Sequence, residues 1–469
     1  MSENVKYLSA RAIAPKPKTG YFDSILRRKP MSGKKRYAIV GTGSRSQMYS
    51  HALLGDYASA CELVGLCDSN PTRMAWANAQ LAEKFAAPPV PAFAPAEFEK
   101  MIATGKVDTV IVTSMDRTHH LYIVRAMEAG CDVITEKPMT IDAEKSATIE
   151  DAIARTGRKL RVAFNYRYAP RNSKVKEVLM GGAIGEVKSV HFEWLLDTKH
   201  GADYFRRWHR DKKNSGGLFV HKATHHFDLV NWWLDTNPTL VYAQGGLVFY
   251  GRENAEARGV TAFYDRGTGH PNAAADPFAL DLSKDEAFRG MYLDAEKDDG
   301  YRRDQSVFSD CISIEDDMAA LVRYASGATM SYHLTAYSPW EGYRVAFNGT
   351  KGRLEYEVVE NSYVSGSEKD QNRPDLRDSR EVELDESVRI LVRPLWGKPL
   401  EIPIASDAEA GHGGGDKRLL RDLFLGDLAD PLGRAADHRS GSDSIMVGIA
   451  ANKSLATGLP VTIAELRRR

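Results

Sequence analysis

The sequence predicts an α/β protein in which a doubly wound parallel sheet precedes an α+β domain with a large, open, mostly antiparallel sheet. Three features indicate this fold. A short apolar strand runs into a glycine-containing turn, strand and helix patterns then alternate up to residue 164, and residues 319–358 show a two-residue apolar alternation. We therefore expect an N-terminal arm at 1–35, a first domain at 36–164 and a second domain at 165–469.

The turn after the first strand has the residues of a dinucleotide-binding site. Residues 37–40 form the strand, Gly41 allows a tight turn, and Gly43 lets a pyrophosphate approach the backbone. Ser46 replaces the third glycine of the usual motif, and the residues after it can open a helix whose N–H groups face the phosphates. We expect cofactor contacts along the whole turn, at Gly41, Gly43, Ser44, Arg45 and Ser46.

Asp68 follows the second predicted strand, residues 61–67. A carboxylate at this position accepts hydrogen bonds from the ribose hydroxyls of the adenosine and repels a 2′-phosphate. This favours NAD over NADP, although Arg73 lies nearby in the sequence. The first domain is therefore predicted to be an NAD-binding Rossmann domain.

Three further strands are predicted in this domain, at 107–113, 132–135 and 160–164. Lys137 follows the second of these at the strand end that faces the ligand crevice of a parallel sheet, and Pro138 fixes the local backbone. Asp142 is expected to cap the helix that runs to about Thr156. The turns after these strands supply the remaining candidate cofactor contacts, Ser114, Asp116, His119, Glu136, Lys137 and Asn165.

The pattern changes beyond Asn165. We expect a helix at 173–180, a strand at 190–196 and a helix at 224–234, followed by the strands of an open antiparallel sheet at 319–324, 329–335, 343–347 and 353–358. Segments 252–315 and 363–410 are charged and poorly periodic. We interpret them as insertions that decorate the sheet.

The composition excludes some classes of protein. Lys plus Arg equals Asp plus Glu, at 63 each, so net charge gives no reason to expect a nucleic-acid partner. No apolar run has the length of a membrane span, and no signal-type segment stands at the N-terminus. The four cysteines lack metal-ligand spacing. We expect a reduced, cytoplasmic protein without a membrane segment.

Taken together, these motifs resemble the Gfo/Idh/MocA family of NAD(P)-dependent oxidoreductases from about Arg36 onward. The resemblance is carried by the glycine turn and by several later stretches: Glu136-Lys137-Pro138, Asn165-Tyr-Arg167, Gly216-Gly217 through His225 to Asp228, and Gly411-His-Gly-Gly-Gly-Asp416. The family implies a nucleotide domain followed by a substrate domain whose open sheet commonly forms subunit contacts.

The chain departs from the family pattern at two functional positions. Many members have Thr-Pro-Asn after the fourth strand, where this chain has Ser114-Met-Asp116. Members that oxidise alcohols usually have Asp four residues before the histidine, and that position is His221 here. The usual lysine–aspartate–histidine trio thus becomes Lys137, His221 and His225.

Oxidation of a secondary alcohol needs a base for the hydroxyl proton and a cation that stabilises the developing alkoxide. We expect Lys137 to hydrogen-bond the hydroxyl and His225 to take the proton near neutral pH, with His221 as a substrate contact or alternative base. His226 is expected to be structural. Asp228 could orient a histidine or cap its neighbours.

Other polar and aromatic residues are placed for a sugar. The candidate substrate contacts are Tyr166, Arg167, Trp208, His209, His221, His225 and His412. The group His221, His225, His226 and Asp228 also suits zinc in principle. We expect no metal, because the stretch before Thr224 is not predicted to be all helix and the resemblance implies none.

The predicted function is NAD-dependent transfer of hydride to or from a secondary hydroxyl of a sugar, cyclitol or glycoside. The alternative is a glycoside hydrolase that uses bound NAD for transient oxidation, elimination, hydration and re-reduction. A non-enzymatic NAD-binding regulator is disfavoured by Lys137 and His225. A homodimer or homotetramer joined through the antiparallel sheet is expected, because an open apolar face needs a cover.

Overall fold

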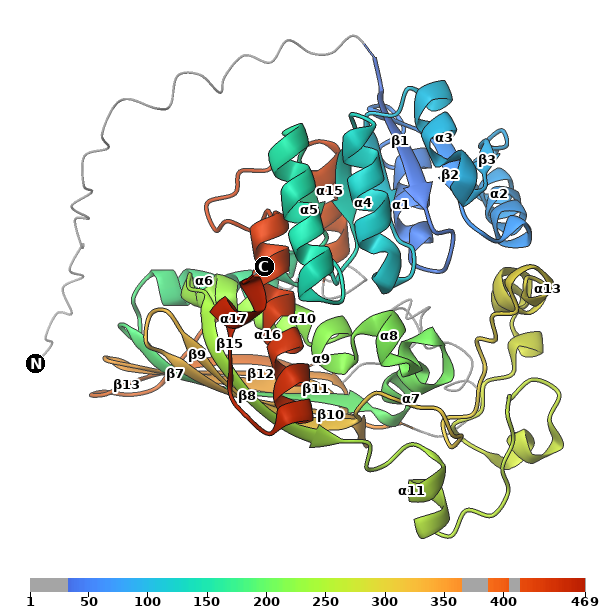
Figure 1. Ribbon diagram of the computed structural model, residues 1–469. Coiled ribbons are helices and arrows are strands. Elements are labelled where there is room, and N and C mark those ends of the chain that lie inside the picture. Colours follow the sequence, from blue (N-terminus) through green and yellow to red (C-terminus); the bar gives the residue numbers. More distant parts are fainter. Residues whose placement is uncertain (1–32, 365–386, 405–413, 469) are drawn as a thin grey trace, which may run out of the picture. The chain divides into compact units, whose positions relative to one another are not determined.

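The computed structural model describes residues 33–364, 387–404 and 414–468, which contain two sheets (Figure 1). The first sheet has six strands in the order β3-β2-β1-β4-β5-β6, all parallel. Its strands are β1 (Lys35–Val40), β2 (Cys61–Cys67), β3 (Ala92–Phe93), β4 (Thr109–Val112), β5 (Asp132–Thr135) and β6 (Leu160–Val162). The predicted doubly wound sheet is confirmed.

Helices cover both faces of this sheet. On one face lie α1 (Ser46–Leu54) and α2 (Pro71–Phe85), and on the other α3 (Phe98–Gly105), α4 (His119–Glu128) and α5 (Ala143–Thr156). Asp142 caps α5 by accepting a hydrogen bond from the backbone N–H of Lys145, as expected. Two helices from the end of the chain complete the cover, α15 (Gly415–Phe424) on the first face and α16 (His438–Thr457) on the second.

The second sheet has nine strands in the order β14-β13-β12-β11-β7-β10-β9-β8-β15. Its pairs are antiparallel except that of β7 with β10, which confirms a mostly antiparallel sheet. The strands are β7 (Val187–Asp197), β8 (Pro238–Gly246), β9 (Asp317–Tyr324), β10 (Thr329–Ser338), β11 (Glu341–Gly349), β12 (Gly352–Asn361), β13 (Ser387–Pro394), β14 (Leu400–Glu401) and β15 (Val461–Thr462).

Within the described parts of the chain, helices cover one face of the second sheet and leave the other face uncovered (Figure 1). The covering helices include α6 (Pro170–Met180), α10 (Thr224–Leu234) and α16, whose apolar side chains share one core with the sheet. Further short helices are α7 (Thr198–Arg206), α8 (Lys212–Ser215), α9 (Leu218–His221) and α17 (Ile463–Arg467). The strands alternate buried and exposed residues because only one face is packed.

Two predicted insertions have different structures. Residues 387–401 form β13 and β14 and so extend the sheet, a correction to their interpretation as insertion. The apolar run Ile390 to Val392 is short and lies between Arg389 and Arg393, which conceals this strand in the sequence. Residues 252–315 do form an excursion, with α11 (Arg252–Ala257), α12 (Glu286–Phe288), the short π-helix η7 (Arg289–Leu293) and α13 (Glu296–Asp299).

In the part of the chain that the structure describes, no helix is both long and apolar enough to cross a membrane. The proposed arm lies outside the described residues up to position 32, as does His412.

Candidate active site

The glycine turn lies at the carboxyl end of β1 and has the geometry of a phosphate-binding turn. Gly41 has a φ of +87°, and a Cβ there would lie 2.6 Å from the backbone of Ser114, so a side chain does not fit. A Cβ on Gly43 would meet only the Tyr292 hydroxyl, at 3.9 Å, which leaves room over the backbone. The helix α1 begins at Ser46, directly after the turn. This arrangement fits a dinucleotide pyrophosphate.

Asp68 lies at the carboxyl end of β2, beside this turn. Its carboxylate accepts hydrogen bonds from the backbone N–H of Thr42 at 2.6 Å, from the Thr42 hydroxyl at 2.9 Å and from the backbone N–H of Asn70 at 2.9 Å. Arg73 Nη1 lies 3.4 Å from the same carboxylate. The Asp68 carboxylate is therefore fixed where the sequence predicts a ribose contact, and Arg73 forms an ion pair with it.

The turns after β4 and β5 are braced against each other by His119. Its ring nitrogens lie 2.8 Å from the carbonyl oxygen of Pro138 and 2.9 Å from that of Ser114. Glu136 accepts hydrogen bonds from Arg45 Nε at 2.6 Å and from the Tyr49 hydroxyl at 2.7 Å. These contacts fix the backbone from which Lys137 projects.

Asn165 follows β6 and is also held by the protein. Its side-chain amide donates a 2.7 Å hydrogen bond to Asp416, at the start of α15. Asp416 also lies 3.6 Å from Arg45 Nη2. The closing glycine-rich stretch of the chain therefore ends beside the glycine turn.

Lys137, Asp116, His209 and His221 meet where the first-sheet turns face the helices before α10. His221 Nδ1 lies 2.6 Å from Asp116 Oδ2, and Lys137 Nζ donates to the carbonyl oxygen of His221 at 3.5 Å. The His209 ring lies edge-to-face with the His221 ring, with centroids 4.1 Å apart. The turn motif predicts a cofactor contact for Asp116, whereas in the structure its carboxylate is hydrogen-bonded to His221.

Burial and charge shift the proton equilibria of this cluster. Burial, reinforced by the neighbouring ammonium of Lys222, lowers the pKa of Lys137 to about 8. Burial lowers the pKa values of His209 and His221 well below the ordinary value, and it raises the pKa of Asp116. Each shift favours the neutral form of the group that it affects, and the contact between Asp116 and His221 is a short hydrogen bond of 2.6 Å.

His225 has a different environment, although it lies one turn further on. Its ring stacks on Tyr166, with centroids 4.2 Å apart and planes at 10°. The Tyr166 hydroxyl accepts from Lys222 Nζ at 3.4 Å. His226 is fully buried, stacks on Trp194 at 4.0 Å and lies 2.7 Å from the Tyr332 hydroxyl, as expected for a structural residue.

Two other candidate substrate contacts are engaged within the protein. Arg167 makes a two-pronged ion pair with Asp228, at 2.6 and 2.7 Å, and both side chains are buried. The Trp208 ring stacks on His209 with centroids 3.5 Å apart. The ion pair occupies the Asp228 carboxylate, which removes Asp228 from the zinc-type group considered in the sequence.

Among the described residues, one group of three metal-type side chains comes close together: Asp116, His209 and His221, with ligand atoms within 4.8 Å of one another. The same atoms of Asp116 and His221 already share a hydrogen bond. Positive charges on Lys137 and Arg207 act on both histidines and oppose a further cation. The arrangement therefore suits proton sharing better than metal binding.

Tyr292 lies near the glycine turn, and the sequence did not indicate it as a site residue. Tyr292, in the 252–315 excursion, accepts a hydrogen bond from the backbone N–H of Ser44 at 3.3 Å. No sequence pattern marks it, because the excursion is poorly periodic and brings the residue to the turn from 248 positions away.

The fold agrees with the comparisons to known proteins. Residues 35–164 match the Gfo/Idh/MocA model described as an oxidoreductase family with NAD-binding Rossmann fold, and residues 176–463 match its C-terminal alpha/beta domain. A putative oxidoreductase, YteT of Bacillus subtilis, is 36% identical over 452 residues, which are 92% of this chain and 98% of YteT.

Two other relatives are more distant. D-glucoside 3-dehydrogenase of Escherichia coli is 33% identical over 156 residues, covering 33% of this chain and 42% of that enzyme. The fold is shared with the WlbA dehydrogenase of Chromobacterium violaceum, crystallised with NADH and UDP-GlcNAcA, at a TM-score of 0.60 and 19% identity over 93% of this chain and 99% of that one. The two model matches span both sheets, and the chain therefore belongs to the Gfo/Idh/MocA family of oxidoreductases, with the family's NAD-binding Rossmann domain.

Proposed function

We propose that this oxidoreductase transfers hydride between NAD and a secondary hydroxyl of a sugar, cyclitol or glycoside. Residues 36–164 would bind the cofactor and residues 165–469 the substrate. The observation that carries the proposal is the cluster of Lys137, Asp116 and His221, in which one cation and one oriented imidazole adjoin the carboxyl end of the parallel sheet.

His221 is the proposed base. Its Nδ1 faces Asp116 at 2.6 Å, so the tautomer with a proton on Nδ1 leaves Nε2 as an acceptor for the substrate hydroxyl. Burial keeps the ring neutral near pH 7, the form that accepts a proton. Asp116 then stabilises the imidazolium that forms.

Lys137 is the proposed electrostatic group. Its ammonium holds the alcohol oxygen and stabilises the negative charge that develops when the proton leaves. When bound, NAD supplies the hydride acceptor of the reaction. His225 is assigned to the substrate wall, because its ring is already stacked on Tyr166.

A carbohydrate substrate is supported by the polar and aromatic character of the surrounding residues. Tyr166, Tyr204 and Trp208 lie around the histidines, with Tyr204 5.5 Å and Trp208 6.1 Å from His221 between ring centroids. Flat rings pack against the C–H faces of a sugar, while imidazoles hydrogen-bond its hydroxyls. The partial relative named D-glucoside 3-dehydrogenase acts on a substrate of this class by its name.

The test is a panel of free sugars, cyclitols and glycosides mixed with protein and NAD, with NADH followed by absorbance. NADH formation with members of the panel is expected, and its loss in Lys137→Ala assigns it to this site. Cleavage of a glycoside without net NADH would instead favour the hydrolase alternative. Neither reaction with any member of the panel would contradict the proposal.

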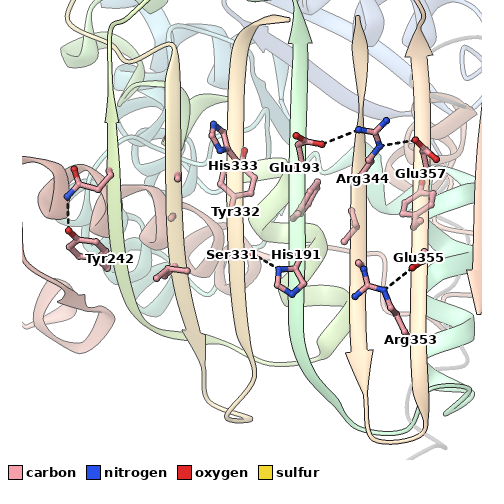
Figure 2. A pocket seen from close by; sticks show the side chains of 18 residues that line it. His191, Glu193, Tyr242, Ser331, Tyr332, His333, Arg344, Arg353, Glu355 and Glu357 are labelled. Carbon is pink, nitrogen blue, oxygen red and sulfur yellow. Dashed lines mark hydrogen bonds and ion pairs between the residues drawn. The ribbon is translucent and has the colours of Figure 1, made fainter. Parts of the chain in front are cut away.

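We also propose a homodimer or homotetramer built on the uncovered face of the second sheet (Figure 2). This face is hollowed by a depression of about 730 Å³. Across it runs a row of charges, in which Arg344 lies 3.5 Å from Glu193 and 2.8 Å from Glu357 (Figure 2). Leu321, also in the lining, is 58% exposed. A face with both signs of charge and exposed apolar groups suits isologous contact with its own copy.

Light scattering at micromolar concentration is expected to give a multiple of 52.0 kDa. Arg344→Glu should shift the protein toward monomer, because it sets three carboxylates in one row. Arg252→Glu, a charge reversal on the exposed helix α11, is the matched control and should leave the mass unchanged. A monomeric parent protein would contradict this proposal.

A further inference from the structure

We propose that residues 286–301 of the excursion complete the NAD site, with the Tyr292 hydroxyl as a ligand of the pyrophosphate, and that this segment keeps NAD bound between turnovers. The proposal rests on the NAD-binding Rossmann domain and not on the proposed carbohydrate chemistry. Its test therefore measures cofactor release without any substrate.

Hydrogen bonds hold the segment to the first turn of α2. The Asn70 side-chain amide donates to the carbonyl oxygen of Ala295 at 2.8 Å, and Arg73 Nε donates to that of Met291 at 3.2 Å. Asp299 lies 3.2 Å from Arg73 Nη2. Asn70 and Arg73 also contact Asp68, so the segment is attached to the same residues that shape the predicted ribose site.

Apolar packing holds the same segment from its other side. Phe288, Met291 and Tyr292 form a small core with Leu280 and Leu282, and Trp76 of α2 packs against it. Contact with α2 is so close at Gly290 that a Cβ there would lie 2.3 Å from the Trp76 indole. The segment is therefore seated on α2 by shape as well as by hydrogen bonds.

This seating brings Tyr292 to the glycine turn. Its hydroxyl accepts the hydrogen bond of the Ser44 N–H at 3.3 Å and lies over Gly43. Backbone N–H groups of such a turn are the donors to a bound pyrophosphate. A phenol at this point can donate its own proton to a phosphate oxygen, and Arg73, whose guanidinium lies 5.8 Å from the ring centroid, adds positive charge nearby.

The consequence is kinetic. Because the segment reaches from the residues around Asp68 to the glycine turn, we expect its contacts with α2 to break before NAD leaves. NAD is therefore expected to remain with the protein through purification and to be released on a scale of minutes.

The first experiment compares Tyr292→Phe with the parent protein. Each is loaded with etheno-NAD and chased with excess NAD, and the loss of bound fluorescence gives the release rate. Loss of a hydrogen bond to a charged group predicts release faster by about tenfold or more. Tyr264→Phe is the matched control, because that phenol bonds Asp276 within the same excursion and does not contact the turn. Unchanged or slower release from Tyr292→Phe would overturn the role of Tyr292.

The second experiment tests the seating of residues 286–301 on α2 separately from the contact of Tyr292 with NAD. Gly290→Val forces the segment away from Trp76 without altering any residue at the turn, and release at least tenfold faster than from the parent is expected. If this variant has near-native circular dichroism and releases NAD at the parent rate, the seating of residues 286–301 on α2 does not retain NAD. Release from the parent within a second would overturn retention itself.

Discussion

Two groups of buried histidines lie within a short stretch of the second domain, and they differ in what surrounds them. His209 and His221 adjoin Asp116 and Lys137, and several charges act on each ring. His226 instead packs between Trp194 and Tyr332 and shares a neutral hydrogen bond with the tyrosine hydroxyl. Both groups bury polar atoms, but only the first buries them beside groups that change protonation.

The difference separates catalytic from structural histidines more clearly than burial does. A neutral, stacked ring with one hydrogen bond stabilises the core and has no proton to exchange with a ligand. A ring hydrogen-bonded to a carboxylate, as His221 is to Asp116, has a partner that stabilises its protonated form. His221 and His226 therefore offer opposite expectations for activity and stability.

The largest expected loss of turnover comes from Lys137→Ala. Removing the cation from the developing alkoxide should raise the barrier by about 3–4 kcal/mol, or roughly a hundredfold to a thousandfold in rate. Reduction of the bound NAD in a single turnover, followed by absorbance, measures the effect, and unfolding in urea should be unchanged. Near-normal turnover would remove Lys137 from the mechanism.

His221→Ala should lower turnover by about a hundredfold, because the proposed base is lost. The double variant with Lys137→Ala should be little slower than the poorer single one, since the two groups act on one hydroxyl. His225→Ala is the comparison, and a larger loss there would return the base to His225.

Asp116→Asn should have a smaller effect, about tenfold in turnover, because the amide oxygen still accepts from His221 Nδ1 but no longer carries the charge that stabilises the imidazolium. Asp116→Ala should cost more, since orientation is lost too. The decisive measurement is kcat in both variants, and equal losses would show that Asp116 acts only through its charge.

Alkaline pH should lower activity through Lys137. Its pKa of about 8 means that the ammonium is lost as pH rises above that value. If the ammonium is the active form, kcat/KM should fall about fivefold between pH 8 and pH 9. A rate that instead rises through pH 8 would make the neutral amine the active form, and Lys137 the base.

His226→Ala should change turnover per folded molecule by less than threefold. Its effect is on stability, with an expected loss of about 2–4 kcal/mol from the vacated ring and the lost hydrogen bond. Tyr332→Phe should lose only about 1 kcal/mol, since the ring remains. Urea unfolding of both variants measures the difference, and a collapse of activity in the folded His226→Ala protein would break the comparison.

Local sequence signals predict the parts of this molecule that depend on neighbours along the chain. The glycine turn, the helix cap at Asp142 and the helix Thr224–Leu234 follow from short motifs, and the structure contains them where expected. The alternating strands from Asp317 to Asn361 are equally clear. In these places the residues that decide the structure lie close together in sequence.

Contacts between distant segments could not be predicted in this way. Asp116 and His221 are 105 positions apart, and Ser44 and Tyr292 are 248 apart. Neither pair produces a periodic pattern in the sequence, and the position of Asp116 after a strand is as compatible with a cofactor contact as with a hydrogen bond to His221. The strand Ser387–Pro394 was hidden for another reason, because Arg389 and Arg393 interrupt its apolar pattern and its neighbours in the sequence are charged.

The last helices of the chain also determine when the first domain can be completed during synthesis. Phe424 of α15 packs edge-on to Tyr37 of β1 at 5.2 Å, and the backbone N–H of Val162 in β6 donates to Ala436 at 3.1 Å. At about 5–20 residues per second, a ribosome delivers these partners roughly 10–50 s after β6 has emerged. Until then the nascent first sheet exposes apolar surface on both faces. Ribosomes stalled before residue 415 should therefore carry a first domain that proteases cut readily, and release of the full chain should protect it.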